Sequence, residues 1–205
     1  MMKVAIIDYD AGNLRNVERA AQRAGLDTVT TRNAEEIRAA KALILPGVGA
    51  MKDAMAHLDA YGLTPLLREE VAKGKKLMGI CLGMQALYDV SEEGGEVPAL
   101  GLLPGRIALF PEGTLKIPHM GWNELSIKRE HPVLAGLPAH SYVYFVHSYY
   151  KTPTDSEDII ATADYGVDVP AVVGKDNVLG FQFHPEKSGD VGIQIWKNTA
   201  KWLIQ

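Results

Sequence analysis

The chain has 205 residues, of which 47% are hydrophobic and 22% charged, and its formal net charge at pH 7 is −4. These values are typical of one globular domain, residues 1–205, and the lack of a basic run argues against nucleic acid as the main partner. The single cysteine, Cys81, excludes an intramolecular disulfide, and no apolar run approaches the roughly 18 residues of a membrane span. The N-terminus fits a strand better than a signal peptide. We therefore expect a cytoplasmic protein that does not cross a membrane.

The first part of the chain alternates strand and helix patterns. Continuous apolar or β-branched runs predict buried strands at residues 4–7, 27–31, 42–45 and 77–80. Amphipathic spacing predicts helices between them at 14–24, 51–60 and 66–72, and Asn33 is suited to cap a further short helix. This alternation predicts an α/β fold with a mostly parallel open sheet and helices on both faces.

After residue 88 the pattern changes to short strand-like pieces. These lie at residues 106–110, 122–127, 142–146 and 159–163, and a hairpin is expected between 171–173 and 178–183, with Gly174, Asp176 and Asn177 at its turn. We expect them to form a mixed or antiparallel extension of the same sheet, with no separate domain. Residues 191–204 place apolar side chains at helical spacing, which predicts an amphipathic helix over one face.

Cys81 has the surroundings of a nucleophile. It follows an apolar run, Gly79 and Gly83 flank it, and helix formers come next, which is the strand–turn–helix outline of a nucleophile elbow. A helix that begins there favours the thiolate, and the N–H of Leu82 is then free to act as an oxyanion donor. The alternative is that Cys81 is a small buried hydrophobe in a parallel strand.

A cysteine nucleophile needs a base, and the base needs an orienting group. His184 ends an apolar run and precedes Pro185, so it is expected at a strand end, where α/β proteins place their sites. In an extended chain Glu186 would lie about 6–7 Å further along the same face and could accept the imidazole N–H. The alternative is an ordinary surface turn at His184-Pro185-Glu186.

A glycine-rich loop, Gly47-Val48-Gly49, follows the third strand. An N–H from such a loop can complete an oxyanion hole with that of Leu82. The loop lacks the pattern of a phosphate cradle. No cysteine–histidine cluster at ligand spacing is present, so no metal and no cofactor are expected.

Two of these segments together resemble the class I (triad) glutamine amidotransferase family. They are Gly79-Ile80-Cys81-Leu82-Gly83-Met84-Gln85 and Phe183-His184-Pro185-Glu186. The resemblance runs the whole length and implies a flavodoxin-like class I fold. Within the family, the resemblance is closest to the glutaminase subunits of imidazole glycerol phosphate synthase. The segments that carry this closer resemblance are Asp8-Tyr9 with Gly12-Asn13-Leu14, Pro46-Gly47-Val48-Gly49-Ala50, Pro118-His119-Met120-Gly121-Trp122-Asn123, Phe145-Val146-His147-Ser148-Tyr149-Tyr150 and His184-Pro185-Glu186-Lys187-Ser188. One departure is Asp10, where many relatives carry glycine.

The resemblance implies that Cys81, His184 and Glu186 form the triad that hydrolyses L-glutamine to L-glutamate and ammonia. It implies that the oxyanion is held by the N–H of Leu82 and by the backbone of the glycine loop at Gly47 and Val48. It implies that the substrate glutamine is held by Gly49, Gln85, Ser148 and Tyr149. Two alternatives stay open for this set. Gln85 could simply face along its helix, and Ser148-Tyr149 could be an ordinary strand end.

The resemblance also implies a partner, a (β/α)8-barrel cyclase subunit that forms a heterodimer with this chain. Ammonia would pass to it along a shielded path and be used in histidine biosynthesis. Residues at or near the interface would be Asn13, Trp122, Lys187 and Ser188. The open alternatives are that Trp122 is a core aromatic and that Lys187 is a solvated surface charge.

Three other functions compete with this interpretation. Triad amidotransferases that serve pyridoxal phosphate, anthranilate or guanylate synthesis share the Cys81 and His184-Pro185-Glu186 sets. A hydrolase of peptides or glutamyl conjugates would need an open cleft and no partner surface. A non-catalytic interaction module of the same fold would not need Cys81, His184 and Glu186 intact.

Overall fold

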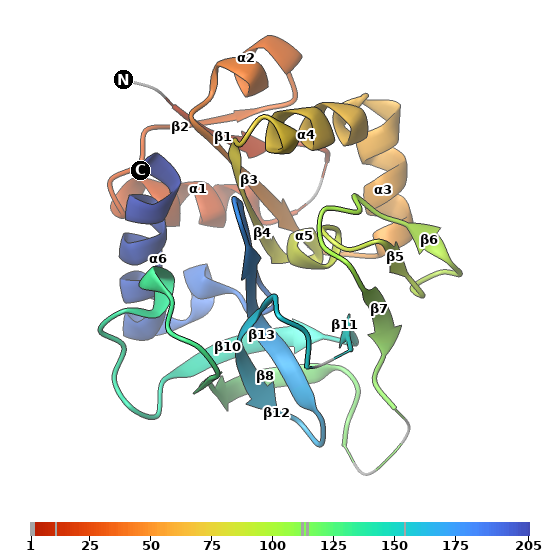
Figure 1. Ribbon diagram of the computed structural model, residues 1–205, viewed down its shortest axis with the longest axis vertical. Coiled ribbons are helices and arrows are strands. Elements are labelled where there is room, and N and C mark those ends of the chain that lie inside the picture. The colour runs from red at the N-terminus through yellow and green to blue at the C-terminus, as the bar shows by residue number, and fades with distance from the viewer. Residues whose placement is uncertain (1–2, 11, 112, 114, 154) are drawn as a thin grey trace.

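A computed structural model describes residues 3–10, 12–111, 113, 115–153 and 155–205. In these ranges the main sheet has eight strands in the order β2-β1-β3-β4-β14-β13-β12-β9 (Figure 1). Their bounds in that order are Thr28–Thr31, Val4–Ile7, Ala42–Gly47, Lys76–Cys81, Val178–Phe181, Asp168–Lys175, Ile159–Asp164 and Ser126–Ile127. From β2 to β14 all neighbours are parallel, and from β14 to β9 they are antiparallel. The predicted α/β class with a mostly parallel sheet is confirmed.

Helices cover both faces of this sheet, as predicted (Figure 1). The helices are α1 (Leu14–Arg23), α2 (Ala34–Ala39), α3 (Met51–Ala60), α4 (Leu63–Ala72), α5 (Leu82–Gln85) and α6 (Gly189–Ile204). Side chains of α1 and α6 pack in one apolar core, and those of α2, α3 and α4 pack in the other. The central strands β1 and β3 are buried along their whole length because both of their faces are covered. No helix in the described ranges is long and apolar enough to span a membrane.

The predicted extension of the sheet is only partly correct. Strands β12, β13 and β14 do extend it, but other strands form two smaller sheets. One sheet pairs β8 (His119–Glu124) with β10 (Tyr142–His147), and the other has the order β11-β7-β5-β6, with bounds Tyr149–Thr152, Arg106–Leu109, Val90–Ser91 and Val97–Pro98. The hairpin of β13 and β14 takes the edge beside β4, and β12 and β9 continue the sheet from there, so the other short strands pair outside it.

Local boundaries follow from a few turn residues. The side chain of Asn33 accepts hydrogen bonds from the N–H groups of Glu35 and Glu36, so its predicted role as a helix cap is confirmed. Helix α4 begins at Leu63, earlier than predicted, because Gly62 turns the chain at φ 68°. The hairpin turns at Asp176-Asn177, with Gly174 inside β13.

Candidate active site

Strand β4 ends at Cys81 in a strained turn. Cys81 has φ 55° and ψ −111°, a conformation that side-chain-bearing residues seldom adopt. The flanking glycines permit it: a Cβ on Gly83 would lie 1.8 Å from the carbonyl oxygen of Leu45, and one on Gly79 would lie 2.5 Å from the carbonyl oxygen of Gly83. The chain therefore makes the strand–turn–helix that the sequence predicts. Helix α5 is a single turn, so its dipole contributes less to the electrostatics at Cys81 than the sequence predicts. The N–H of Leu82 has no hydrogen-bond partner within so short a helix.

His184 and Glu186 are hydrogen-bonded to each other, with 2.7 Å between Nδ1 and Oε1. The extended geometry expected from the sequence is wrong. Residues Pro185–Lys187 form a 3-10 turn that brings the carboxylate back to the imidazole. Both side chains are 1% exposed, so the pair is shielded from water.

The electrostatics of this pair favour the imidazolium. Burial lowers the pKa of His184, but the Cys81 sulfur and the Glu186 carboxylate outweigh it and raise the pKa to about 9. Nε2 of His184 is buried and has no hydrogen-bond partner among the described residues, so it is available to a neighbouring group. A histidine of this kind can hold a proton beside a thiolate at neutral pH.

Cys81 and His184 open into one cavity of about 390 Å³. All four residues predicted to hold the substrate line it, together with two of the predicted oxyanion residues. The full lining is Val48, Gly49, Cys81, Leu82, Gln85, Glu93, Pro118, Val146, His147, Ser148, Tyr149 and His184. Its volume lies at the lower end of the range of small-molecule pockets.

The glycine loop lies directly beside the cysteine. Gly47 pairs with Cys81 across β3 and β4, and its lack of a side chain is required because a Cβ there would lie 2.5 Å from the hydroxyl of Tyr9. That hydroxyl donates a hydrogen bond of 2.7 Å to the carbonyl of Pro46 and so holds the start of the loop in place. Val48 and Gly49 line the cavity, and Gly47, which precedes them, is not among the lining residues.

Gln85 faces the cavity and is held by two hydrogen bonds. Its Nε2 donates to the carbonyl of Tyr149 at 2.8 Å and to Oε1 of Gln182 at 3.0 Å. An amide has two donors, so its oxygen is the group left to meet a ligand. The alternative in which Gln85 only faces along its helix is wrong.

The four predicted interface residues differ in their surroundings. Trp122 is 56% exposed, which excludes a core position, and Lys187 is exposed. Asn13 is half-buried, and its amide contacts Glu186. Ser188 is 1% exposed, because its hydroxyl donates to the carbonyl of His184 and accepts from the N–H of Tyr144. Its side chain therefore offers no surface to a partner and instead holds the segment that carries His184. This residue lies beyond the end of β14 at Phe181 and not at the strand end that the sequence predicts, because the chain leaves the sheet before the 3-10 turn.

Three residues around the cysteine were missed by the sequence analysis. Nε2 of Gln182 lies 4.0 Å from Sγ of Cys81. Gln182 is a polar residue inside an apolar run, and this pattern could have marked it as a site residue. His147 and Glu93 line the cavity. Glu93 reaches it from a distant loop, where it accepts a hydrogen bond from the N–H of Met51 at the start of α3. Nothing in the local pattern around Glu93 or His147 indicates this placement.

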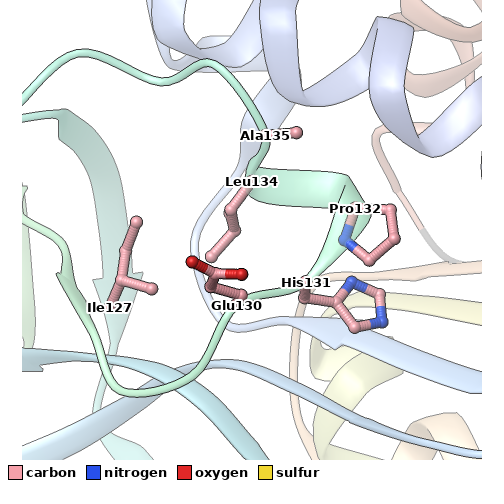
Figure 2. Close-up of a pocket in the computed structure, with 6 residues that line it drawn as sticks. All are labelled: Ile127, Glu130, His131, Pro132, Leu134 and Ala135. Atoms are coloured by element: carbon pink, nitrogen blue, oxygen red, sulfur yellow. The ribbon is translucent and has the colours of Figure 1, made fainter.

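A larger hollow of about 630 Å³ lies elsewhere, beside β9 and the short helix at Pro132–Leu134 (Figure 2). It is lined by Ile127, Glu130, His131, Pro132, Leu134 and Ala135. None of these residues was predicted for the site, and the hollow contains neither a nucleophile nor a pair of oriented catalytic groups. The smaller cavity at Cys81 is therefore the candidate active site.

The fold and the cysteine–histidine–glutamate arrangement define a known class of protein. Residues 5–200 match the family described as Glutamine amidotransferase class-I, and the chain belongs to that family. The chain also resembles two solved structures, one titled a crystal structure of glutamine amidotransferase (TM-score 0.75, 24% identity, 96% of this chain and 97% of that one) and one titled PurLQS from Thermotoga maritima (TM-score 0.75, 19% identity, 98% and 99%). At these identities the structures support the fold alone.

Curated relatives narrow the family to one branch. The imidazole glycerol phosphate synthase subunit HisH of Desulfitobacterium hafniense is 49% identical over 98% of this chain and 94% of its own length. The subunit of the same name from Geobacillus thermodenitrificans is 50% identical over 95% of this chain and 93% of its own length. The predicted resemblance to a class I amidotransferase, closest to the imidazole glycerol phosphate synthase subunits, is confirmed.

Proposed function

We propose that this chain is the glutaminase subunit of an imidazole glycerol phosphate synthase and acts in the cytoplasm as a single amidotransferase domain, with Cys81, His184 and Glu186 as its catalytic triad. The observation that carries the proposal is the cavity at which the strained Cys81 and a buried, Glu186-paired His184 meet. The family and the relatives supply the amide substrate and the pathway. The geometry supports the roles proposed for the residues.

The reaction begins when Sγ of Cys81 attacks the side-chain carboxamide carbon of L-glutamine. The carbonyl oxygen gains negative charge, which the N–H of Leu82 and the backbone at Gly47-Val48 would stabilise. His184 holds the proton taken from sulfur and gives it to the departing nitrogen, so that the C–N bond breaks and ammonia leaves. Water, deprotonated by His184, then attacks the thioester and releases L-glutamate and the thiol.

The remaining cavity residues are suited to an amino acid. The oxygen of Gln85 is an acceptor for an N–H group of the substrate, and its orientation is fixed by its two donated hydrogen bonds. Gly49, Ser148 and Tyr149 supply the facing wall. A cavity of about 390 Å³ has room for a free amino acid.

A partner is needed because ammonia released into neutral water becomes ammonium, which is not a nucleophile. We propose a (β/α)8-barrel cyclase subunit that docks over the cavity to form a heterodimer and receives ammonia along a shielded path. Exposed Trp122 and Lys187 suit such a contact, and half-buried Asn13 donates a hydrogen bond to Glu186. Val48 is 38% exposed at the cavity, and its flanking glycines allow its peptide to reorient. We expect low glutaminase activity from the free subunit and a rise when the partner is liganded.

The test uses the complex of this chain with its cyclase partner. Wild type is expected to hydrolyse glutamine and support glutamine-dependent synthesis. Cys81→Ala is expected to lose both but to keep synthesis from added ammonium salt, because the partner is untouched. Equal glutamine turnover by wild type and Cys81→Ala would refute the triad. Failure of Cys81 to react with a glutamine analogue that labels thiols would favour the non-catalytic module.

A further inference from the structure

Two histidines that the proposed triad does not use lie opposite each other in the small β8–β10 sheet. His119 and His147 are cross-strand partners, with 3.1 Å between Nδ1 of His119 and Nε2 of His147. Both are buried, at 2% and 6% exposure. Buried imidazoles without a catalytic partner call for an account of where their hydrogen bonds lead.

The hydrogen bonds allow one arrangement of protons when both rings are neutral. Nδ1 of His147 lies 2.8 Å from the carbonyl of Tyr149, which can only accept, so this nitrogen carries the proton. Nε2 of His147 must then accept from Nδ1 of His119. Nε2 of His119 in turn accepts from the amide of Asn123, at 3.2 Å. Every donor in the series points toward Tyr149.

The rings are held in their neutral state. Burial lowers the pKa of His119 to about 4. Burial also lowers the pKa of His147, to about 3, against the effect of its hydrogen bond to Tyr149. His119 is stacked between Phe145 and Tyr165, with ring centroids 4.5 and 4.0 Å away. Neither the protonation nor the orientation of these rings is therefore free to change near neutral pH.

The series ends at the wall of the cavity. The carbonyl of Tyr149 accepts from His147 and from Nε2 of Gln85, both at 2.8 Å, so both of its lone pairs are used. Gln85 is also tied to Gln182, whose Nε2 faces Sγ of Cys81. One connected set of hydrogen bonds thus runs from Asn123 in β8 to the residues around the nucleophile.

The other face of the same sheet is open to a partner. Side chains alternate along β8, so His119 and Asn123 face inward while Met120 and Trp122 face outward and are 61% and 56% exposed. The two-stranded sheet therefore has the histidines on its inner face and the proposed docking surface on its outer face.

We propose that His147, oriented by His119 and Asn123, is a positioning residue for the substrate: it fixes the Tyr149 carbonyl and, through it, the Gln85 amide that meets glutamine. The inference rests on the proposed glutaminase function. It assigns His147 to ground-state substrate binding and not to proton transfer, since its only donor is used on a backbone carbonyl.

The experiment measures kcat and KM for glutamine in the complex with the cyclase partner. His147→Leu removes the donor to Tyr149 and is expected to raise KM about tenfold with kcat nearly unchanged, which is the pattern of lost uniform binding. His147→Asn places an amide nitrogen near the Nδ1 position and is expected to restore KM to within about threefold of wild type. The matched control is Val143→Ala, a buried residue on the same face of β10, which is expected to lower the thermal midpoint without changing KM.

A double variant tests whether the two histidines act as one unit. His119→Leu is expected to raise KM less than His147→Leu does, and the double variant is expected to match His147→Leu alone. A wild-type KM in folded His147→Leu, or additive effects of the two changes, would overturn the role while leaving the glutaminase intact. If His147→Leu does not fold, His147→Asn and His119→Leu decide the question by the same KM values. A wild-type complex that does not hydrolyse glutamine would refute the proposed function, and this role with it.

Discussion

The side-chain amide of Asn13 donates a hydrogen bond of 2.6 Å to Oε1 of Glu186, joining residues 173 positions apart. The same carboxylate oxygen lies 2.7 Å from Nδ1 of His184. Asn13 stands at the start of α1 with φ 75°, and it is half-buried. A residue that the resemblance assigns to the partner interface therefore also holds the carboxylate of the proposed triad.

Asn13→Ala is expected to lower kcat for glutamine about tenfold, because Glu186 loses a charge-assisted hydrogen bond that fixes its orientation. Asn13→Asp is expected to lower it further, since a second carboxylate would face Glu186. Steady-state assays of the complex measure both. The matched control is Asn16→Ala, which removes the exposed side chain that donates a hydrogen bond to Asn13. This variant is expected to leave kcat nearly unchanged. Equal losses for Asn13→Ala and Asn16→Ala would contradict the prediction.

Glu186→Gln is expected to move the alkaline limb of the glutaminase pH profile to lower pH. The carboxylate helps to raise the pKa of His184 to about 9, so its removal lowers that pKa and the imidazolium is lost at a lower pH. We also expect kcat to fall on the order of a hundredfold, the scale of a misdirected base. Profiles of kcat against pH for both proteins are the measurement. Glu69→Gln, at an exposed position of α4, is the control, and an unshifted limb in Glu186→Gln would argue against the pairing.

Gly83→Ala is expected to lower the free energy of unfolding by at least about 3 kcal/mol or to prevent folding. Its Cβ would lie 1.8 Å from the carbonyl oxygen of Leu45, which is backbone and cannot move aside cheaply. Gly95→Ala is the control: Gly95 has φ 106° with open space around it, so we expect only conformational strain of about 1 kcal/mol. Urea unfolding compares the two. Similar losses would mean that the elbow is less tightly packed than described.

Trp122→Ala is expected to weaken binding of the cyclase partner about thirtyfold, the scale of an aromatic hot spot, and to leave the unfolding midpoint unchanged because the side chain is 56% exposed. Titration calorimetry with the purified partner measures the change. The control is Ile204→Ala, which is 53% exposed at the far end of α6, about 23 Å along that helix from the site. Unchanged affinity in Trp122→Ala would move the interface elsewhere.

The sequence alone determined the parallel half of the fold and the candidate nucleophile. Strands β1, β3 and β4 contain apolar runs that end before Asp8, at Gly47 and at Cys81, and such local patterns specify both the element and its end. The elbow is equally local, since it depends on Gly79 and Gly83 within a few residues of Cys81. The family membership also followed from short motifs.

Long-range pairing was decided only by the tertiary structure. Strands β7, β8, β10 and β11 pair outside the main sheet, because which short strands meet depends on a sheet edge far away in sequence. The bond from Asn13 to Glu186, the burial of Ser188 and the histidine pair beneath Trp122 likewise join segments that carry no mutual signal. Hydrogen bonds and burial are properties of neighbours in space. A sequence specifies the chemistry of each side chain, and packing alone determines which side chains meet.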